Sequence, residues 1–196
     1  MRSTKNPHDD NNHYADEIKN RIATLVKQEE AREKKKQEII SIFASLADKI
    51  KAASDRVALT QVLQLTVKDV QHTLTGQLGN GNDPDITLGI KVVTIESDAV
   101  TLTFAPGNKI NFYREGLIQF EVQGKQKPVM MNGVMKVDNK SVNSNLAETY
   151  TLIYKKDTGW SLIIHPDVIQ ERTGESLTEE GVLRIIYGFF QRDLGL

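Results

Sequence analysis

A histidine, a proline and an aspartate stand together at residues 165–167, where the residue types most readily suggest catalysis. An imidazole that is oriented by a nearby carboxylate can act as a general base. Such a base needs a nucleophile or a substrate, and the neighbouring Ser161 lacks the flanking glycines of a nucleophile elbow. A proline after an apolar segment also commonly ends a strand. The sequence therefore predicts no catalytic residue, and we expect a protein that is not an enzyme.

Two other groups of side chains carry the nitrogen and oxygen atoms that metals prefer. His8 and His13 flank two aspartates, but their spacing does not place both imidazoles on one helix face. Residues 79–85, GNGNDPD, lack the spacing of a calcium loop and the lysine of a phosphate loop, so we interpret them as a linker. The absence of cysteine excludes disulfides, thiolate nucleophiles and cysteine zinc sites. We predict no metal and no cofactor.

The basic side chains cluster at one place, which consists of Arg32, Lys34, Lys35 and Lys36. Nucleic-acid recognition uses a basic face with few acids. Four glutamates are interleaved here, namely Glu29, Glu30, Glu33 and Glu38. The formal net charge of −1 also gives no long-range field that would capture a polyanion. The four basic residues are therefore candidate phosphate contacts, but the sequence favours a solvated helix face over nucleic-acid binding.

Length and composition describe an ordinary folded protein. The chain has 196 residues, of which 39% are hydrophobic and 26% are charged, enough for one domain with an appendage. No apolar run approaches the ~20 residues of a membrane-spanning helix, and the first residues lack the apolar core of a secretory signal. We therefore expect a cytoplasmic protein that does not bind membranes. A small cysteine-free chain also suits an accessory protein of a phage, plasmid or immunity system.

Residues 14–53 have the spacing of a long helix, after a polar segment, residues 1–13, that we interpret as a flexible tail. Apolar side chains recur at steps of three and four, as in a heptad seam, at Ile18, Ile22, Leu25, Ile39, Phe43, Leu46 and Ile50. The same frame passes through Glu29, Arg32 and Lys36, where no apolar face exists. One helix of this length would extend roughly 60 Å. We predict a protruding, coiled-coil-like stalk that self-associates or binds a helical partner.

A second helix is predicted over residues 55–78. Ser54 or Asp55 can serve as its N-cap, and Gly79 suits its C-cap. Its apolar residues form a broad stripe that could pack on a sheet, at Leu59, Val62, Leu63, Leu65, Val70 and Leu74. His72 would then be a partly exposed residue on this helix.

Between residues 86 and 164 the apolar period changes to two, as in antiparallel strands with one solvated face. The inward side chains form four sets: Val100, Leu102 and Phe104; Ile118, Phe120 and Val122; Tyr150, Leu152 and Tyr154; Trp160, Leu162 and Ile164. Turn-forming residues such as Ser97 and Gly159 separate the sets. We predict an antiparallel meander of about seven strands.

The chain ends in a predicted helix over residues 177–192, with Ser176 as N-cap and Glu179 completing a capping box. Residues 181–190 are apolar on nearly all sides, and such a helix needs burial on all sides. We expect it to pack on the sheet and also to contact a partner through Ile185, Ile186, Phe189 and Phe190. Gly181 and Gly188 would share a face that a second backbone could approach.

The sequence thus predicts an α+β fold in which residues 54–196 form the main domain after the long helix. The favoured function is a non-catalytic protein-interaction or assembly subunit, as a homo-oligomer or with a helical partner, whose α+β domain provides specificity. One alternative is a small-ligand-binding or enzymatic domain that uses the concave face of the sheet, with a pocket of Tyr150, Tyr154, Trp160 and His165. The other is a nucleic-acid-associated protein that contacts phosphates through the Arg32–Lys36 segment.

Overall fold

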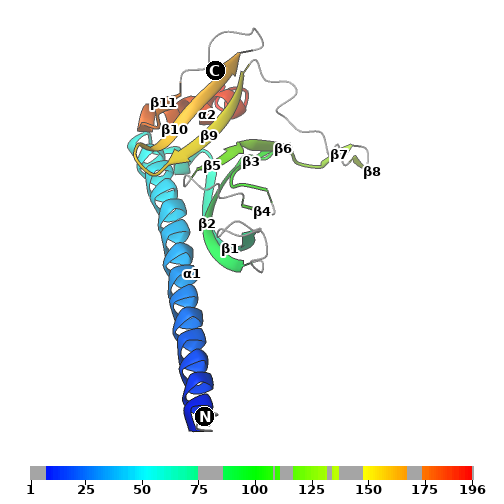
Figure 1. Ribbon diagram of the computed structural model, residues 1–196. Coiled ribbons are helices and arrows are strands. Elements are labelled where there is room, and N and C mark those ends of the chain that lie inside the picture. Colours follow the sequence, from blue (N-terminus) through cyan, green and yellow to red (C-terminus); the bar gives the residue numbers. More distant parts are fainter. Residues whose placement is uncertain are drawn as a thin grey trace, which may run out of the picture. The chain divides into compact units, whose positions relative to one another are not determined.

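The computed structural model describes residues 8–74, 86–107, 109–110, 117–131, 134–136, 148–166 and 174–195 (Figure 1). The chain divides into two compact units, residues 1–39 and residues 40–196. The predicted linker at residues 79–85 and Asp167 of the histidine–proline–aspartate segment lie outside the described residues.

The long N-terminal helix is confirmed as α1, His8–Arg56, which begins inside the segment predicted as a flexible tail. Nearly every residue in its charged middle is a good helix former, so the helix continues where no apolar face supports it. It ends at a turn in which Ala58 adopts the left-handed conformation, with φ of 50°. The N–H of Ala58 donates to the carbonyl of Asp55 at 3.1 Å, and a short 3₁₀ helix, Leu59–Gln61, follows.

The predicted second helix over residues 55–78 is wrong, because this segment contains the strand β1, Gln64–Leu74. β1 pairs antiparallel with β2, Ile86–Glu96, along its entire length. Its β-branched residues, such as Thr66, Val67 and Val70, suit a strand better than a helix. His72 lies on this strand and is buried, so its predicted exposure on a helix is also wrong.

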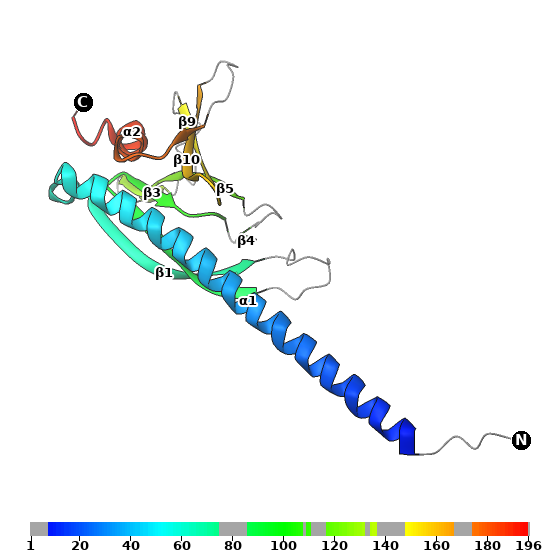
Figure 2. The same cartoon turned by 60° about the vertical axis from the view of Figure 1, so that its left-hand side comes forward.

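The first sheet contains five strands in the order β4-β1-β2-β3-β6. Figure 2 labels β1, β3 and β4 of this sheet. The strands not yet introduced are β3 (Val100–Phe104), β4 (Lys109–Ile110) and β6 (Gln123–Gln126). All its pairs are antiparallel except β1 with β4, which run parallel over two residues. Val100, Leu102 and Phe104 of β3 are buried, as their alternation predicts.

The second sheet contains four antiparallel strands in the order β11-β10-β9-β5. Its strands are β5 (Ile118–Glu121), β9 (Glu148–Lys155), β10 (Gly159–Pro166) and β11 (Glu175–Ser176). A separate ribbon pairs β7, Val129–Met131, with β8, Val134–Lys136. The expectation of one meander is therefore wrong.

The chain passes between the two main sheets at Val122, which separates β5 from β6. Val122 is fully buried, and its N–H donates to the carbonyl of Tyr150 at 2.9 Å. A single extended segment thus contributes one strand to each sheet. Alternation over residues 117–122 predicts the buried residues correctly but cannot predict that the partner strand changes.

The predicted C-terminal helix is confirmed as α2, Glu179–Phe190. Its N-cap is Thr178, whose hydroxyl accepts from the N–H of Gly181 at 3.2 Å, and not the predicted Ser176, which lies in β11. α2 packs on the second sheet (Figure 1). The ring centroids of Phe189 and Tyr150 lie 6.0 Å apart.

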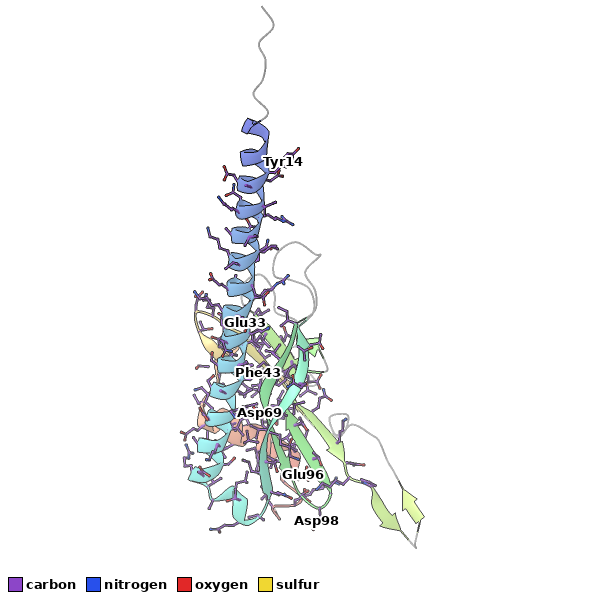
Figure 3. The ribbon with its side chains drawn as sticks, turned by 90° about the horizontal axis from the view of Figure 1, so that it is seen from below. Tyr14, Glu33, Phe43, Asp69, Glu96 and Asp98 are labelled. Carbon is purple, nitrogen blue, oxygen red and sulfur yellow. The ribbon has the colours of Figure 1, made fainter. Side chains whose placement is uncertain are left out.

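The C-terminal part of α1, residues 40–56, also packs on the second sheet. The rings of Phe43, Phe120 and Trp160 form a cluster with centroids 5.8–6.3 Å apart. The indole N–H of Trp160 donates to the carbonyl of Ile42 at 3.1 Å, which fixes the helix on the sheet. Figure 3 labels Phe43 on this part of the helix.

Candidate interaction surfaces and grooves

The predicted helix seam of α1 contains two kinds of residues. Four of its members are buried, namely Ile39, Phe43, Leu46 and Ile50. The remaining three, Ile18, Ile22 and Leu25, are exposed by 60%, 55% and 51%. All seven share one heptad frame, but the buried residues belong to the protein's own interior. The exposed ones alone are available to another molecule.

We define the apolar stripe as Ile18, Ile22, Leu25 and Val26 of α1. Every residue from 14 to 31 is exposed, and Tyr14, labelled in Figure 3, adds another exposed ring near the stripe. Scattered exposed apolar residues are ordinary on soluble proteins. Here they recur on one face of one helix at steps of three, four and one, which is the pattern of a helix-binding seam.

The charges beside the stripe are arranged unevenly. With Ile22 at position a and Leu25 at position d, Lys19 and Arg21 occupy the flanking e and g positions. The acids of this segment, Asp16 and Glu17, lie away from the seam at positions b and c. Lys19 approaches Asp16 at 3.7 Å, but both side chains are at least 70% exposed, so this ion pair contributes little.

The predicted basic cluster lies on α1 among glutamates of the same helix. Arg32 is 3.5 Å from Glu29, and Lys36 donates to Glu33. Lys34 is exposed, and Lys35 is half-buried. The intrahelical partners of Arg32 and Lys36 reduce the positive potential that a phosphate would meet.

The four residues of α2 that were predicted to contact a partner are all buried, namely Ile185, Ile186, Phe189 and Phe190. They pack into the protein's own core. The exposed apolar residue of this helix is Tyr187, at 49%.

The four residues of the predicted pocket do not line one cavity. Trp160 pairs with Tyr154 across the hairpin of β9 and β10, and Tyr150 lies on the same face of the sheet. Their rings fill the space between this face and the helices, as the ring pair of Tyr154 and Trp160 at 5.4 Å illustrates. His165 lies on the opposite face, where its Nε2 is 3.1 Å from the hydroxyl of Thr151.

A polar network connects β9 with α2. The guanidinium of Arg184 donates to Glu148 Oε1 at 2.7 Å, and the hydroxyl of Tyr150 donates to Glu148 Oε2 at 3.2 Å. Burial raises the pKa of Tyr150 to about 12, and the negative charge of Glu148 acts in the same direction. The hydrogen bond to Glu148 raises the pKa of Arg184. The network holds a protonated phenol and a charged pair, which suits docking of the helix rather than proton transfer.

A groove of about 650 Å³ lies beside α2. Its apolar lining includes Val57, Leu59, Leu162, Ile164, Leu183 and Tyr187. Charged groups at its border include Glu175, Glu180 and Arg184. Sequence patterns do not predict this groove, because its walls combine Val57 and Leu59 with residues between 162 and 194, far along the chain. Tyr187, the exposed aromatic residue of α2, is the signal in the sequence that could have indicated it.

The outer edge of β1 is a further candidate surface. On that side β1 pairs with β4 only at Thr73 and Leu74, and residues 64–72 meet no other described strand. Val67 and Val70 are 39% and 38% exposed. The carbonyl of Val70 is 3.2 Å from Nδ1 of His72, a side-chain contact within this strand.

Within the described part of the chain, no three histidine or acidic side chains are grouped so that they could hold a metal ion. None of the described helices is long and apolar enough to cross a membrane. Comparison of the chain with models of protein families, with curated proteins and with solved structures finds no match.

Proposed function

We propose that this protein is a non-catalytic interaction subunit that binds a helix through the apolar stripe of α1. The observation that carries this proposal is the exposure of Ile18, Ile22, Leu25 and Val26, each more than half exposed, on one helix face. The residues that continue this frame toward residues 40–196 are charged and then buried, so the stripe is a discrete surface of just over one heptad.

The energy available from the stripe is moderate. Covering the exposed half of an isoleucine or leucine side chain contributes about 1 kcal/mol, so the four residues together contribute about 4 kcal/mol. Association of two molecules costs at least ~4 kcal/mol in lost freedom. The stripe therefore needs additional contacts, and the charges beside it decide which helix binds.

A second candidate function is supported by the groove beside α2. Its volume of about 650 Å³ and its mostly apolar lining suit a small apolar ligand with one charged group. This differs from the predicted pocket, since none of Tyr150, Tyr154, Trp160 and His165 lines it. Nucleic-acid binding through Arg32 and Lys36 has weaker support, because both side chains have glutamate partners.

The test of the proposed function compares the full-length protein with the variant Ile18→Ser/Ile22→Ser/Leu25→Ser. Light scattering over a range of concentrations measures self-association, and affinity capture from extract of the source cells measures binding to other proteins. We expect the wild-type protein to form an assembly, with itself or with a captured protein, that the triple variant does not form.

A control variant, Asn20→Ser/Thr24→Ser/Gln37→Ser, carries the same number of substitutions at exposed positions of α1 that lie away from the seam, namely f, c and b. It should assemble like the wild type. Identical masses and identical captured proteins for the wild type and the stripe variant would contradict the proposed function. Circular dichroism on both variants checks that α1 remains helical.

A further inference from the structure

The positions that flank the apolar stripe carry positive charge and no negative charge. From Ile18 to Gln28 the e and g positions are Lys19, Arg21, Val26 and Gln28. In paired helices these positions contact the corresponding positions of the partner and determine which partner is accepted. Both basic side chains lie in the exposed part of α1, so an approaching helix meets them at the border of the seam.

A second copy of this chain is a poor partner for the stripe. In a parallel pair, Glu29, Arg32 and Lys36 would each face their own copy at a or d positions. In an antiparallel pair that places Ile18 of one copy opposite Ile22 of the other, each e position lies beside an e position of the second copy. Each g position then lies beside a g position. Lys19 would then approach Lys19, and Arg21 would approach Arg21. Like charges are unfavourable in both arrangements.

A lipid surface is also a poor match. Helices that lie in a membrane interface carry lysine and arginine across their polar face. The polar face of this segment contains Asp16 and Glu17 along with Lys27, so it would not be attracted to anionic lipid. Two of the three basic side chains between residues 14 and 28, Lys19 and Arg21, lie at the borders of the stripe.

We propose that the partner of the stripe is an amphipathic helix of another protein whose apolar seam is flanked by aspartate or glutamate. Such a helix would cover Ile18, Ile22 and Leu25 while its acids pair with Lys19 and Arg21. This inference rests on the proposed function and adds the chemistry of the partner to it.

Two synthetic helical peptides of three heptads test the proposal with the full-length protein. Both have leucine at a and d, and they differ only in glutamate or lysine at every e and g position. Fluorescence anisotropy of the labelled peptides measures both affinities. We expect the glutamate peptide to bind on the order of ten-fold more tightly than the lysine peptide, and the difference to shrink in high salt.

Charge reversal on the protein makes the test specific to the two flanking residues. The variant Lys19→Glu/Arg21→Glu should reverse the preference and bind the lysine peptide more tightly. The matched control Lys27→Glu/Lys34→Glu makes the same change of charge at two exposed f positions and should keep the wild-type preference.

Several results would overturn the inference. Equal binding of both peptides, lost in the stripe variant Ile18→Ser/Ile22→Ser/Leu25→Ser, would leave a helix-binding stripe without selection of charge. A stripe-dependent dimer in light scattering would identify a second copy as the occupant. Stripe-dependent binding to vesicles that contain phosphatidylserine would identify a lipid surface. Failure of both peptides to bind overturns the inference, while the capture experiment above decides separately on the proposed function.

Discussion

At the scale of single residues, the surroundings of Gly188 explain a glycine whose role the sequence suggested wrongly. Gly181 and Gly188 of α2 were expected to admit a second backbone. Instead, a Cβ atom at Gly188 would collide with the hydroxyl oxygen of Tyr150, so this glycine makes room for a side chain of β9. A Cβ atom at Gly181 would have its nearest neighbour, in Leu162, at an ordinary 3.4 Å.

The substitution Gly188→Ala should therefore destabilise the fold, whereas Gly181→Ala should not. The displaced Tyr150 ring costs about 1–3 kcal/mol, partly offset by the ~1 kcal/mol that alanine gains over glycine in a helix. We expect a net loss of up to about 2 kcal/mol at position 188 in urea unfolding. Gly181→Ala is the control and should leave stability unchanged or slightly higher. Equal effects of the two substitutions would contradict the close contact.

The Tyr150 hydroxyl should also make stability depend on alkaline pH. Burial and Glu148 raise the folded-state pKa of Tyr150 to about 12, above the value in the unfolded chain. The unfolded chain therefore loses this proton first, so stability falls as the pH rises from the unfolded pKa toward about 12. The measurement is the stability difference between the wild type and Tyr150→Phe at several pH values. That difference should shrink over this window, and a constant difference would contradict the raised pKa.

At the scale of elements, α1 shows why a local sequence pattern predicts a helix but does not predict which of its residues are buried. One heptad frame runs through Ile22 and Phe43, yet Ile22 is 55% exposed and Phe43 is fully buried. The difference arises because Phe43 meets the rings of Phe120 and Trp160, which come from strands far along the chain. Spacing along one helix contains no information about these partners.

Alanine substitution at these two positions should have very different effects on the free energy of unfolding. Phe43→Ala removes a ring from a packed cluster and should cost about 3–5 kcal/mol. Ile22→Ala removes an exposed side chain and should change stability by less than ~0.5 kcal/mol. Chemical unfolding of both variants measures this difference. A large loss for Ile22→Ala would mean that the stripe is covered in the isolated protein.

The strand β1 shows the opposite failure, in which a local pattern suggests the wrong element. Leu59, Val62, Leu63 and Val70 happen to fit a helical period, and β1 is exposed along most of its length, so no alternation reveals it. Eleven paired positions with β2 outweigh this weak local preference. The strands β3 and β5 were predictable because their alternation reflects burial directly. In β9 the sequence alternates as well, although Thr151 on the opposite face is also buried. The division of these strands between two sheets was not predictable, because pairing is a long-range property.

At the scale of the whole molecule, the two units have different sources of stability. Residues 40–196 contain nearly all of the buried apolar residues, while residues 14–31 contain none. A helix without burial depends on its backbone hydrogen bonds and side-chain pairs, and such helices are marginal in water. The candidate interaction surface thus lies on the least stabilised part of α1.

Hydrogen exchange should show this contrast within one continuous helix. Amides of residues 14–31 should exchange by local opening far faster than those of residues 40–53, which exchange with the core. Mass spectrometry of peptic peptides measures both segments in one experiment. Equal protection at high dilution would contradict the contrast. Protection of residues 14–31 that appears when the glutamate-flanked peptide is added would locate its binding site.

The chain has a single tryptophan, and it lies where α1 meets the second sheet. Trp160 is 3% exposed and is held by its indole hydrogen bond to Ile42. Its intrinsic fluorescence should therefore have a blue-shifted maximum that moves to longer wavelength when this interface opens. Emission from Trp160 reports on the α+β unit without any label. A tryptophan placed in a partner peptide would add a second emission signal. Subtracting the emission of Trp160 would leave the signal of the peptide, which reports on docking on the stripe.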